Sequence, residues 1–168
     1  TSMRALLQRV SSASVRVDEK MVGEIGQGLL IYLGVQRGDT AATGDKLFDK
    51  IVNYRMFSDA SGKMNLSVND VNGGLLIVSQ FTLAAETGKG RRPGFSSAAD
   101  PDLAKKLYDY CIAQAQRLSA VTSDSSSSHA SGQMLKARVA AGVFGANMQV
   151  SLTNDGPVTF MLEVKPDL

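Results

Sequence analysis

Three polar side chains stand at the end of an otherwise apolar run, residues 75–83, and they are the first candidates for chemistry. Ser79, Gln80 and Thr82 follow four consecutive aliphatic residues, which are typical of a buried strand. Polar groups in such a place must be hydrogen-bonded or used, because burying them without partners is costly. The segment therefore predicts either a strand end whose hydroxyls bond only to neighbouring backbone, or a reactive site.

A second candidate is the Gly156-Pro157 pair, which lies between two alternating apolar runs at residues 148–152 and 158–164. A Gly-Pro bond has little preference for the trans form, so the cis form is accessible and would present two carbonyl oxygens on one side of a tight turn. Taken alone, the segment predicts an ordinary hairpin turn.

The scarcity of histidine and cysteine excludes several mechanisms. The one histidine, His129, lies in a serine-rich stretch, whereas Ser-His-Asp and Cys-His machinery needs a rigidly held imidazole. The one cysteine, Cys111, sits among apolar residues and is expected to pack rather than react. The usual zinc ligand sets are therefore missing, while an oxygen-only magnesium site stays open. No cofactor and no metal are expected.

Strands in local runs and two helices must position these residues. Helical spacing over residues 42–54 predicts one amphipathic helix, and Asp100-Pro101 supplies an N-cap and a first-turn proline for a second. Residues 119–132 are polar and poor in large side chains, which predicts a flexible insertion. Three apolar runs predict a β-meander: residues 5–17, 21–25 and 28–35. This order favours an α+β fold with an antiparallel or mixed sheet.

Length and composition set broader bounds. A chain of 168 residues that is 43% hydrophobic suits a single domain over residues 1–168. No apolar run approaches the length that spans a bilayer, and the start of the sequence lacks the pattern of a signal peptide. A cytoplasmic location without a membrane partner is expected.

The two candidate segments together resemble the two signature motifs of the D-aminoacyl-tRNA deacylases, Ser-Gln-Phe-Thr-Leu at residues 79–83 and Gly-Pro-Val-Thr at residues 156–159. The resemblance extends in order through residues 8–10, 23–25, 54–59, 62–65, 92–93 and 148–152. It implies a small β-barrel-like core with two helices outside, in a homodimer. It also implies a hydrolase that releases D-amino acids, and mischarged glycine, from the 3′-terminal ribose of tRNA, as chiral proofreading in translation. The serine-rich stretch departs from the family pattern.

The resemblance further implies how chirality is read. The carbonyls of Gly156 and Pro157 would reach into the partner protomer's pocket and bind the amino group of the substrate. An L side chain would then collide with this backbone, whereas a D side chain would point to solvent. Arg9 would support the motif by hydrogen-bonding to its carbonyls, and the alternative is a surface arginine on the opening strand.

Backbone amides and hydroxyls suffice for hydrolysis of an activated ester, whose neighbouring ribose 2′-hydroxyl can help to activate water. Amides around Phe81 and Thr82 would stabilise the oxyanion, each donor being worth roughly 3 to 4 kcal/mol. Ser79 and Gln80 would hold the terminal adenosine and its ribose, while Phe81 offers a ring face or fills the core. Attack by the Thr82 hydroxyl ranks lower, because no positioned base is evident.

A compact basic loop carries Lys89, Arg91 and Arg92 close in sequence to the polar strand end. It would track phosphates at the acceptor end of tRNA, and its alternative is a solvated turn. A net charge of only +2 argues against a broad nucleic-acid surface. Two other functions stay open: a noncatalytic RNA-binding module, which leaves the paired motifs unexplained, and a metabolite hydrolase, which needs no tRNA.

Overall fold

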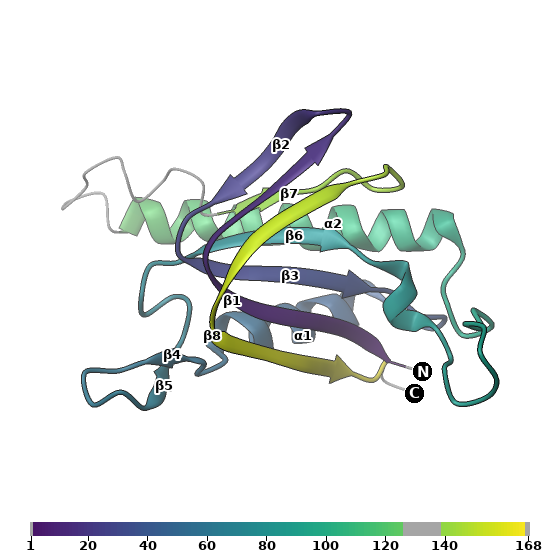
Figure 1. Ribbon diagram of the computed structural model, residues 1–168, viewed down its shortest axis with the longest axis horizontal. Coiled ribbons are helices and arrows are strands. Elements are labelled where there is room, and N and C mark those ends of the chain that lie inside the picture. Colours follow the sequence, from purple (N-terminus) through teal and green to yellow (C-terminus); the bar gives the residue numbers. More distant parts are fainter. Residues whose placement is uncertain (1, 126–138, 167–168) are drawn as a thin grey trace.

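The computed structural model describes residues 2–125 and 139–166, and its centre is the long strand β1 (Met3–Val17). One edge of β1 pairs with β2 and β3, and the other pairs with β8 (Figure 1). The sheet order is β2-β1-β3-β6-β7, with β8 attached to β1. The bounds of the remaining strands of this sheet are β2 (Lys20–Ile25), β3 (Gly28–Gly34), β6 (Gly74–Ser79), β7 (Val139–Ala141) and β8 (Gln149–Val164).

The sheet is mixed and curls until its two ends meet. The β3–β6 and β6–β7 pairs are parallel, whereas β1 pairs with its three neighbours in the antiparallel sense. The terminal strands β2 and β7 come so close that a Cβ on Gly23 would lie 3.0 Å from the Ala141 carbonyl oxygen. The result is a nearly closed, barrel-like sheet.

Two helices, α1 (Ala41–Asn53) and α2 (Pro101–Ser125), lie together behind the sheet (Figure 1). Thr40 caps α1 in a reciprocal arrangement with Thr43, a capping box that the sequence prediction missed. The Asp100 carboxylate accepts the Leu103 backbone N–H at 3.0 Å, so the predicted cap of α2 is confirmed. Three short elements complete the described chain: β4 (Phe57–Ser58), β5 (Met64–Leu66) and the 3₁₀ helix η1 (Phe81–Ala84).

Each face of the sheet buries its own apolar cluster. Between the sheet and the helices, strand residues such as Leu7 and Ile77 pack with Leu47 of α1 and Leu107 of α2. Inside the curl of the sheet, a smaller cluster is built on Val10, Val15, Ile25, Leu30, Leu76 and Val78. Alternate residues of β1, β3 and β6 thus face two cores, which explains why β3 and β6 are continuously apolar in sequence.

The predicted α+β class, with a barrel-like mixed sheet and two outer helices, is confirmed. Two local predictions are wrong. The segment around Gly156 and Pro157 is no hairpin turn, because β8 runs through it and pairs with β1 on both sides of it. Residues 119–125 belong to α2 rather than to a loop, because each residue added to an existing helix gains a backbone hydrogen bond without a new nucleation step. The rest of the predicted insertion, with His129, lies outside the described residues.

Candidate functional site

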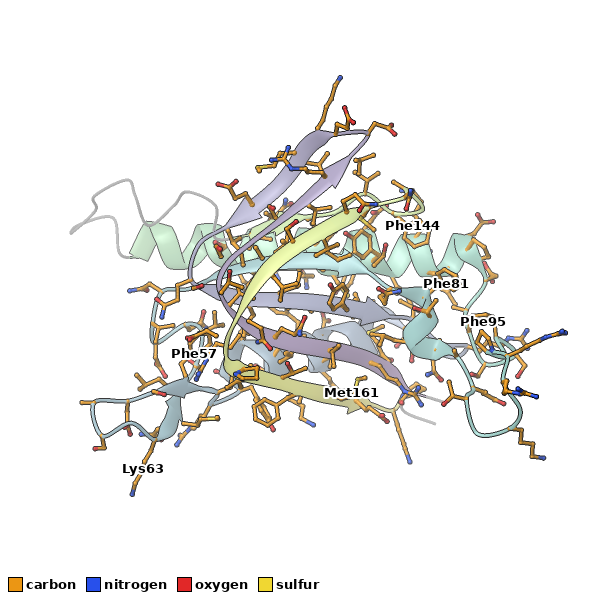
Figure 2. The ribbon with its side chains drawn as sticks, in the orientation of Figure 1. Phe57, Lys63, Phe81, Phe95, Phe144 and Met161 are labelled. Carbon is orange, nitrogen blue, oxygen red and sulfur yellow. The ribbon has the colours of Figure 1, made fainter. Side chains whose placement is uncertain are left out.

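The polar strand end lies where β6 leaves the sheet. The Gln80 backbone N–H donates to the Leu33 carbonyl at 2.8 Å, and the chain then turns into η1. The Gln80 side-chain amide hydrogen-bonds to the Thr82 hydroxyl. Phe81 is 61% exposed, and its ring packs on Phe95 with ring centroids 5.3 Å apart (Figure 2). Phe81 therefore offers a ring face rather than filling the core.

The start of η1 also presents backbone donors. Phe81 and Thr82 are the first two residues of this helix, and first-turn amides have no carbonyl within their own helix to bond to. The first backbone hydrogen bond of the turn is donated by Leu83 to the Gln80 carbonyl, at 3.1 Å. Two adjacent amides next to an exposed ring are a suitable arrangement for stabilising a developing negative charge on a carbonyl oxygen.

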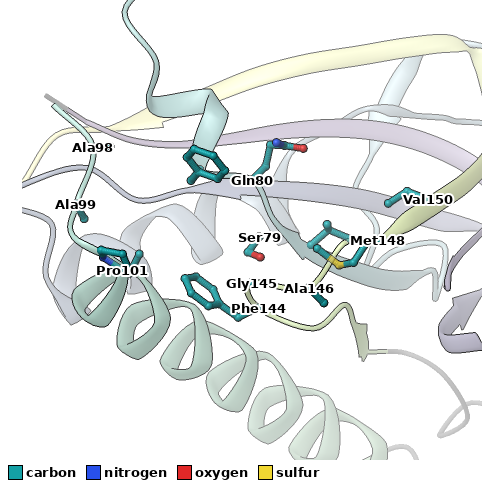
Figure 3. A pocket seen from close by; sticks show the side chains of 13 residues that line it. Ser79, Gln80, Ala98, Ala99, Pro101, Phe144, Gly145, Ala146, Met148 and Val150 are labelled. Carbon is teal, nitrogen blue, oxygen red and sulfur yellow. The ribbon is translucent and has the colours of Figure 1, made fainter. Parts of the chain in front are cut away.

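A cavity of about 480 Å³ opens beside this strand end (Figure 3). Residues 79–81 form one wall, Phe144 and Met148 stand opposite, and Pro101 of α2 closes one end. The Ser79 hydroxyl points into the space between these walls. Apolar walls with a few polar groups are typical of a site for a flat aromatic ligand. Of the predicted residues Ser79, Gln80, Phe81 and Thr82, the first three line the cavity and Thr82 does not. The prediction missed Phe144, and it included Met148 only as the start of a segment that resembles the family, without a role in the site.

The Gly156-Pro157 pair forms a bulge on β8. The register passes from Gln8 opposite Thr159 to Val10 opposite Asn154, so that the residues between them stand out of the ladder. The peptide bond between Gly156 and Pro157 is cis, and Gly156 has a φ of +129°, a conformation that an L residue rarely adopts.

Two side chains to which the sequence prediction gave no role hold the ends of this bulge. The Asn154 amide donates to the Arg9 carbonyl at 2.9 Å and to the Val158 carbonyl at 3.0 Å. The Thr159 hydroxyl donates to the Asn154 side-chain oxygen at 3.3 Å. Their signal was present in the sequence, since an asparagine and a threonine flank the Gly-Pro pair at either end of the segment.

Arg9 is not a solvated surface arginine, because only 11% of its side chain is exposed. Its Nε donates to the Asp155 carbonyl at 3.2 Å and faces the Asp155 carboxylate at 3.5 Å, while Nη1 donates to the Met56 carbonyl at 2.9 Å. The carbonyl that it binds belongs to the residue before Gly156, and not to Gly156 or Pro157 as predicted. Arg9 thus links Asp155, which precedes Gly156 in the bulge, to the segment that follows α1.

A family model described as D-Tyr-tRNA(Tyr) deacylase matches residues 6–163, which span both motifs and the strands that carry them. The chain belongs to this family. The D-aminoacyl-tRNA deacylase of Cellvibrio japonicus is 54% identical over 162 residues, covering 96% of this chain and 99% of the relative. Those of Histophilus somni and Pseudoalteromonas translucida are 52% and 53% identical over the same length, each covering 96% of this chain and all of the relative.

Two solved structures share the fold of this chain. A chain described as c-Myc DNA Unwinding Element Binding Protein superposes with a TM-score of 0.81 at 35% identity, covering 96% of this chain and 99% of that one. A structure described as a probable eukaryotic D-amino acid tRNA deacylase superposes with a TM-score of 0.74 at 20% identity, covering 98% of this chain and all of the other. The second likeness shows the fold alone.

Within one protomer of this deacylase-family chain, the structure does not bring the two motifs together. Neither Gly156 nor Pro157 lines the cavity, although Val150, near the start of the same strand β8, does. The strand end and the Gly-Pro pair are therefore separate features of a single chain. Arg9 belongs with the second of them.

The basic loop stands beside the cavity of this deacylase-family chain. Glu86 and Gly94 pair across its base, with N···O distances of 2.7 and 3.0 Å, and Phe95 then packs on Phe81 at the cavity wall. Its three cations are exposed: Lys89, Arg91 and Arg92.

Other possible functional groups have different surroundings. Burial raises the pKa of Cys111 to about 12, so its thiol is neutral and poorly nucleophilic. Among the described residues, no group of three or more histidine, cysteine or acidic side chains could hold a metal ion. No helix in the described part of the chain is long and apolar enough to cross a membrane.

Proposed function

We propose that this chain hydrolyses the ester between a D-amino acid, or mischarged glycine, and the 3′-terminal ribose of tRNA, and that it leaves L-aminoacyl-tRNA intact. As a D-aminoacyl-tRNA deacylase it is a hydrolase of a carboxylic ester, acting in the cytoplasm in chiral proofreading during translation. The observation that carries the proposal is the cavity at the end of β6, which the first signature motif lines on one side.

The cavity receives the terminal adenosine. The adenine base lies between the apolar walls that include Phe144 and Met148, while the Ser79 hydroxyl and the Gln80 amide bind the ribose. Phe81, exposed at the rim, covers the base or the ester. The ester carbonyl then lies over the start of η1, where the amides of Phe81 and Thr82 are its oxyanion donors.

Hydrolysis is assisted by the substrate. The ribose 2′-hydroxyl polarises a water molecule, which attacks the ester carbonyl. The bond to the 3′-oxygen breaks, and that oxygen takes the proton that the water releases. The alternative nucleophile, the Thr82 hydroxyl, is hydrogen-bonded to the Gln80 amide, and a neutral carboxamide accepts protons too weakly to activate it.

Chirality is read by the second motif of a partner protomer in a homodimer. This arrangement is supported by the cavity lining, which within one chain includes neither Gly156 nor Pro157. Asn154 and Arg9 hold the bulge so that the carbonyls of Gly156 and Pro157 bind the substrate's amino group. A rigid backbone wall excludes L side chains without gripping D side chains, which predicts tolerance of many D-amino acids.

Binding of tRNA is local to the acceptor end. Lys89, Arg91 and Arg92 lie on the loop next to the cavity rim, where they bind backbone phosphates. Three such contacts give a binding constant that decreases moderately with salt concentration.

The deciding experiment follows the release of labelled tyrosine from D-Tyr-tRNA and L-Tyr-tRNA side by side. Rapid loss of the D ester alone is expected. Salt-sensitive binding of tRNA without turnover would replace the proposal with a nucleic-acid-binding module, a function that the name of one structural relative suggests for that protein. Comparable turnover of small D-amino-acid esters would replace it with a metabolite hydrolase.

The action of the motif across a dimer has its own test, the mixing of two inactive variants. Gly156→Ala damages the bulge and Gln80→Ala damages the cavity. If the motif acts across the interface, half of the randomly mixed dimers have one intact composite site, which restores about a quarter of the wild-type activity. No recovery on mixing would show that each chain uses its own motif.

A further inference from the structure

A buried tyrosine of α2, Tyr108, is hydrogen-bonded beneath the cavity without reaching into it. Its side chain is 2% exposed, and its hydroxyl lies 3.0 Å from the Ile77 carbonyl oxygen and 3.1 Å from the Gly142 carbonyl oxygen. Ile77 lies in β6, and Gly142 is the residue that follows β7. One hydroxyl therefore joins a helix to the ends of two neighbouring strands.

Both carbonyls belong to segments that become walls of the cavity. Ile77 precedes Ser79 by two residues, and Gly142 precedes Phe144 by two. The Tyr108 ring also packs on the Phe144 ring, with centroids 5.9 Å apart. One turn earlier on α2, Ala104 contributes to the cavity itself. The tyrosine thus contacts the Phe144 ring and the strand β6 that leads to Ser79, on two sides of the cavity.

We propose that Tyr108 is a positioning residue that sets the spacing between two walls of the cavity, the one formed by residues 79–81 and the one formed by Phe144. This spacing determines the affinity for the terminal nucleoside of tRNA. The inference rests on the proposed function of the cavity. It concerns a residue that touches neither the substrate nor the reacting ester.

The hydrogen bonds indicate which wall depends on the hydroxyl. The Ile77 carbonyl also accepts the Gly142 backbone N–H at 2.9 Å, so it keeps a partner when the hydroxyl is removed. The Gly142 carbonyl accepts its side-chain hydrogen bond from the Tyr108 hydroxyl. Burial raises the pKa of Tyr108 to about 12, so the group stays protonated and remains a donor at physiological pH. Its loss therefore loosens the segment from Gly142 to Phe144 and leaves β6 in place.

The test compares Tyr108→Phe with Tyr110→Phe on the same helix. Tyr108→Phe keeps the ring that packs on Phe144 and removes only the hydroxyl. Tyr110 makes side-chain hydrogen bonds of its own, to both Asp45 carboxylate oxygens at 2.9 and 3.1 Å, and does not line the cavity. Tyr110→Phe thus also removes hydroxyl hydrogen bonds from α2, but these bonds are exposed and their residues do not line the cavity.

Three quantities are measured for each variant: KM and kcat for D-Tyr-tRNA, and the dissociation constant of adenosine 5′-monophosphate as a probe of the nucleoside site. For Tyr108→Phe we expect KM and the probe's dissociation constant to rise about tenfold, the effect of losing roughly one buried hydrogen bond, while kcat stays within twofold. For Tyr110→Phe we expect KM and the probe's dissociation constant to stay within twofold of the wild-type values.

Unchanged KM and probe affinity in Tyr108→Phe would overturn the inference, as would an equal change in Tyr110→Phe, which would indicate general loosening of α2. If the wild type binds the probe but does not hydrolyse D-Tyr-tRNA, the proposed reaction fails, and the probe affinities alone decide the role of Tyr108. A wild-type protein that neither binds the probe nor hydrolyses the ester would reject both.

Discussion

Replacement of Arg9 is expected to weaken the fold and the stereochemical selectivity together. The Arg9 guanidinium joins two backbone segments that are distant in sequence, through the carbonyls of Met56 and Asp155. Arg9→Met keeps the apolar stem and removes both hydrogen bonds. Arg9→Lys keeps the charge, but its single Nζ cannot occupy both positions of the guanidinium fork.

The expected loss follows from the geometry. Each of the two bonds from a charged donor to a carbonyl contributes about 1.5 kcal/mol or more. The ion pair of Arg9 with Asp155 adds little, because the carboxylate side chain is 58% exposed. Arg9→Met should therefore lower the free energy of unfolding by about 3 kcal/mol and Arg9→Lys by about half of that. If the bulge on β8 loses about 1.5 kcal/mol of its support, discrimination between D and L esters should decline by about tenfold.

Urea unfolding measures the first effect, and the ratio of kcat/KM for D-Tyr-tRNA and L-Tyr-tRNA measures the second. The control is Arg16→Met on the same strand, because Arg16 is exposed and donates a single long bond, 3.4 Å, to the Glu19 carbonyl. Its effect on unfolding should stay within about 0.5 kcal/mol. If Arg9→Met matched Arg16→Met in both measurements, Arg9 would not hold the bulge.

Three further changes test other parts of the structure. In Gly28→Ala, the new Cβ would lie 2.0 Å from the Gly74 carbonyl oxygen, so β3 and β6 must separate. We expect the free energy of unfolding in urea to fall by more than about 3 kcal/mol. In the control Gly26→Ala it should change little, because a Cβ on Gly26 has no neighbouring atom within 4 Å. Burial raises the pKa of Asp39 from 3.8 to about 6, so between these pH values the folded state holds a proton that the unfolded state has lost. The free energy of unfolding should therefore fall as pH rises from about 4 to 6, by roughly 3 kcal/mol at most. Asp39→Asn, which can still accept the Gln36 N–H, should abolish this fall in denaturation curves measured across that range, and an unaltered slope would contradict the assignment. Iodoacetamide at pH 8 should label Cys111 only after denaturation, as mass spectrometry would detect, since its thiol is buried and its pKa is about 12; labelling of the native protein would show that α2 opens.

Much of the fold could be predicted because its signals are local. The Asp100-Pro101 start of α2 and the apolar runs of β1 to β3 depend on neighbouring residues only, and the structure confirms them. The path of β8 could not be predicted in this way. A segment with asparagine, aspartate, glycine and proline favours a hairpin turn locally, but pairing with β1 on both sides of it keeps the segment within one continuous strand and leaves only a bulge.

The same distinction applies to the candidate site. The polar residues at the end of β6 stood out in sequence because they interrupt an apolar run, and Ser79, Gln80 and Phe81 indeed line the cavity. The opposite wall comes from Phe144, which the chain reaches only after α2 and β7. Nothing near Phe144 in sequence indicates this role, because a wall made by tertiary packing has no local pattern. Arg9 was singled out, but its acceptors, the Met56 and Asp155 carbonyls, depend on the register of three segments.

The pairing of β1 with β8 also governs how the chain acquires its structure. Met3 pairs with Val164, so the ribosome makes the first strand long before its partner. At roughly 5 to 20 residues per second, the interval is on the order of ten seconds or more, during which one edge of β1 has no strand beside it. Contacts so distant in sequence give slow folding, because a long loop must close before they form. We therefore expect the nascent chain to complete its fold only after β8 emerges. We also expect substitutions that weaken the pairing of β8 with β1 to slow refolding.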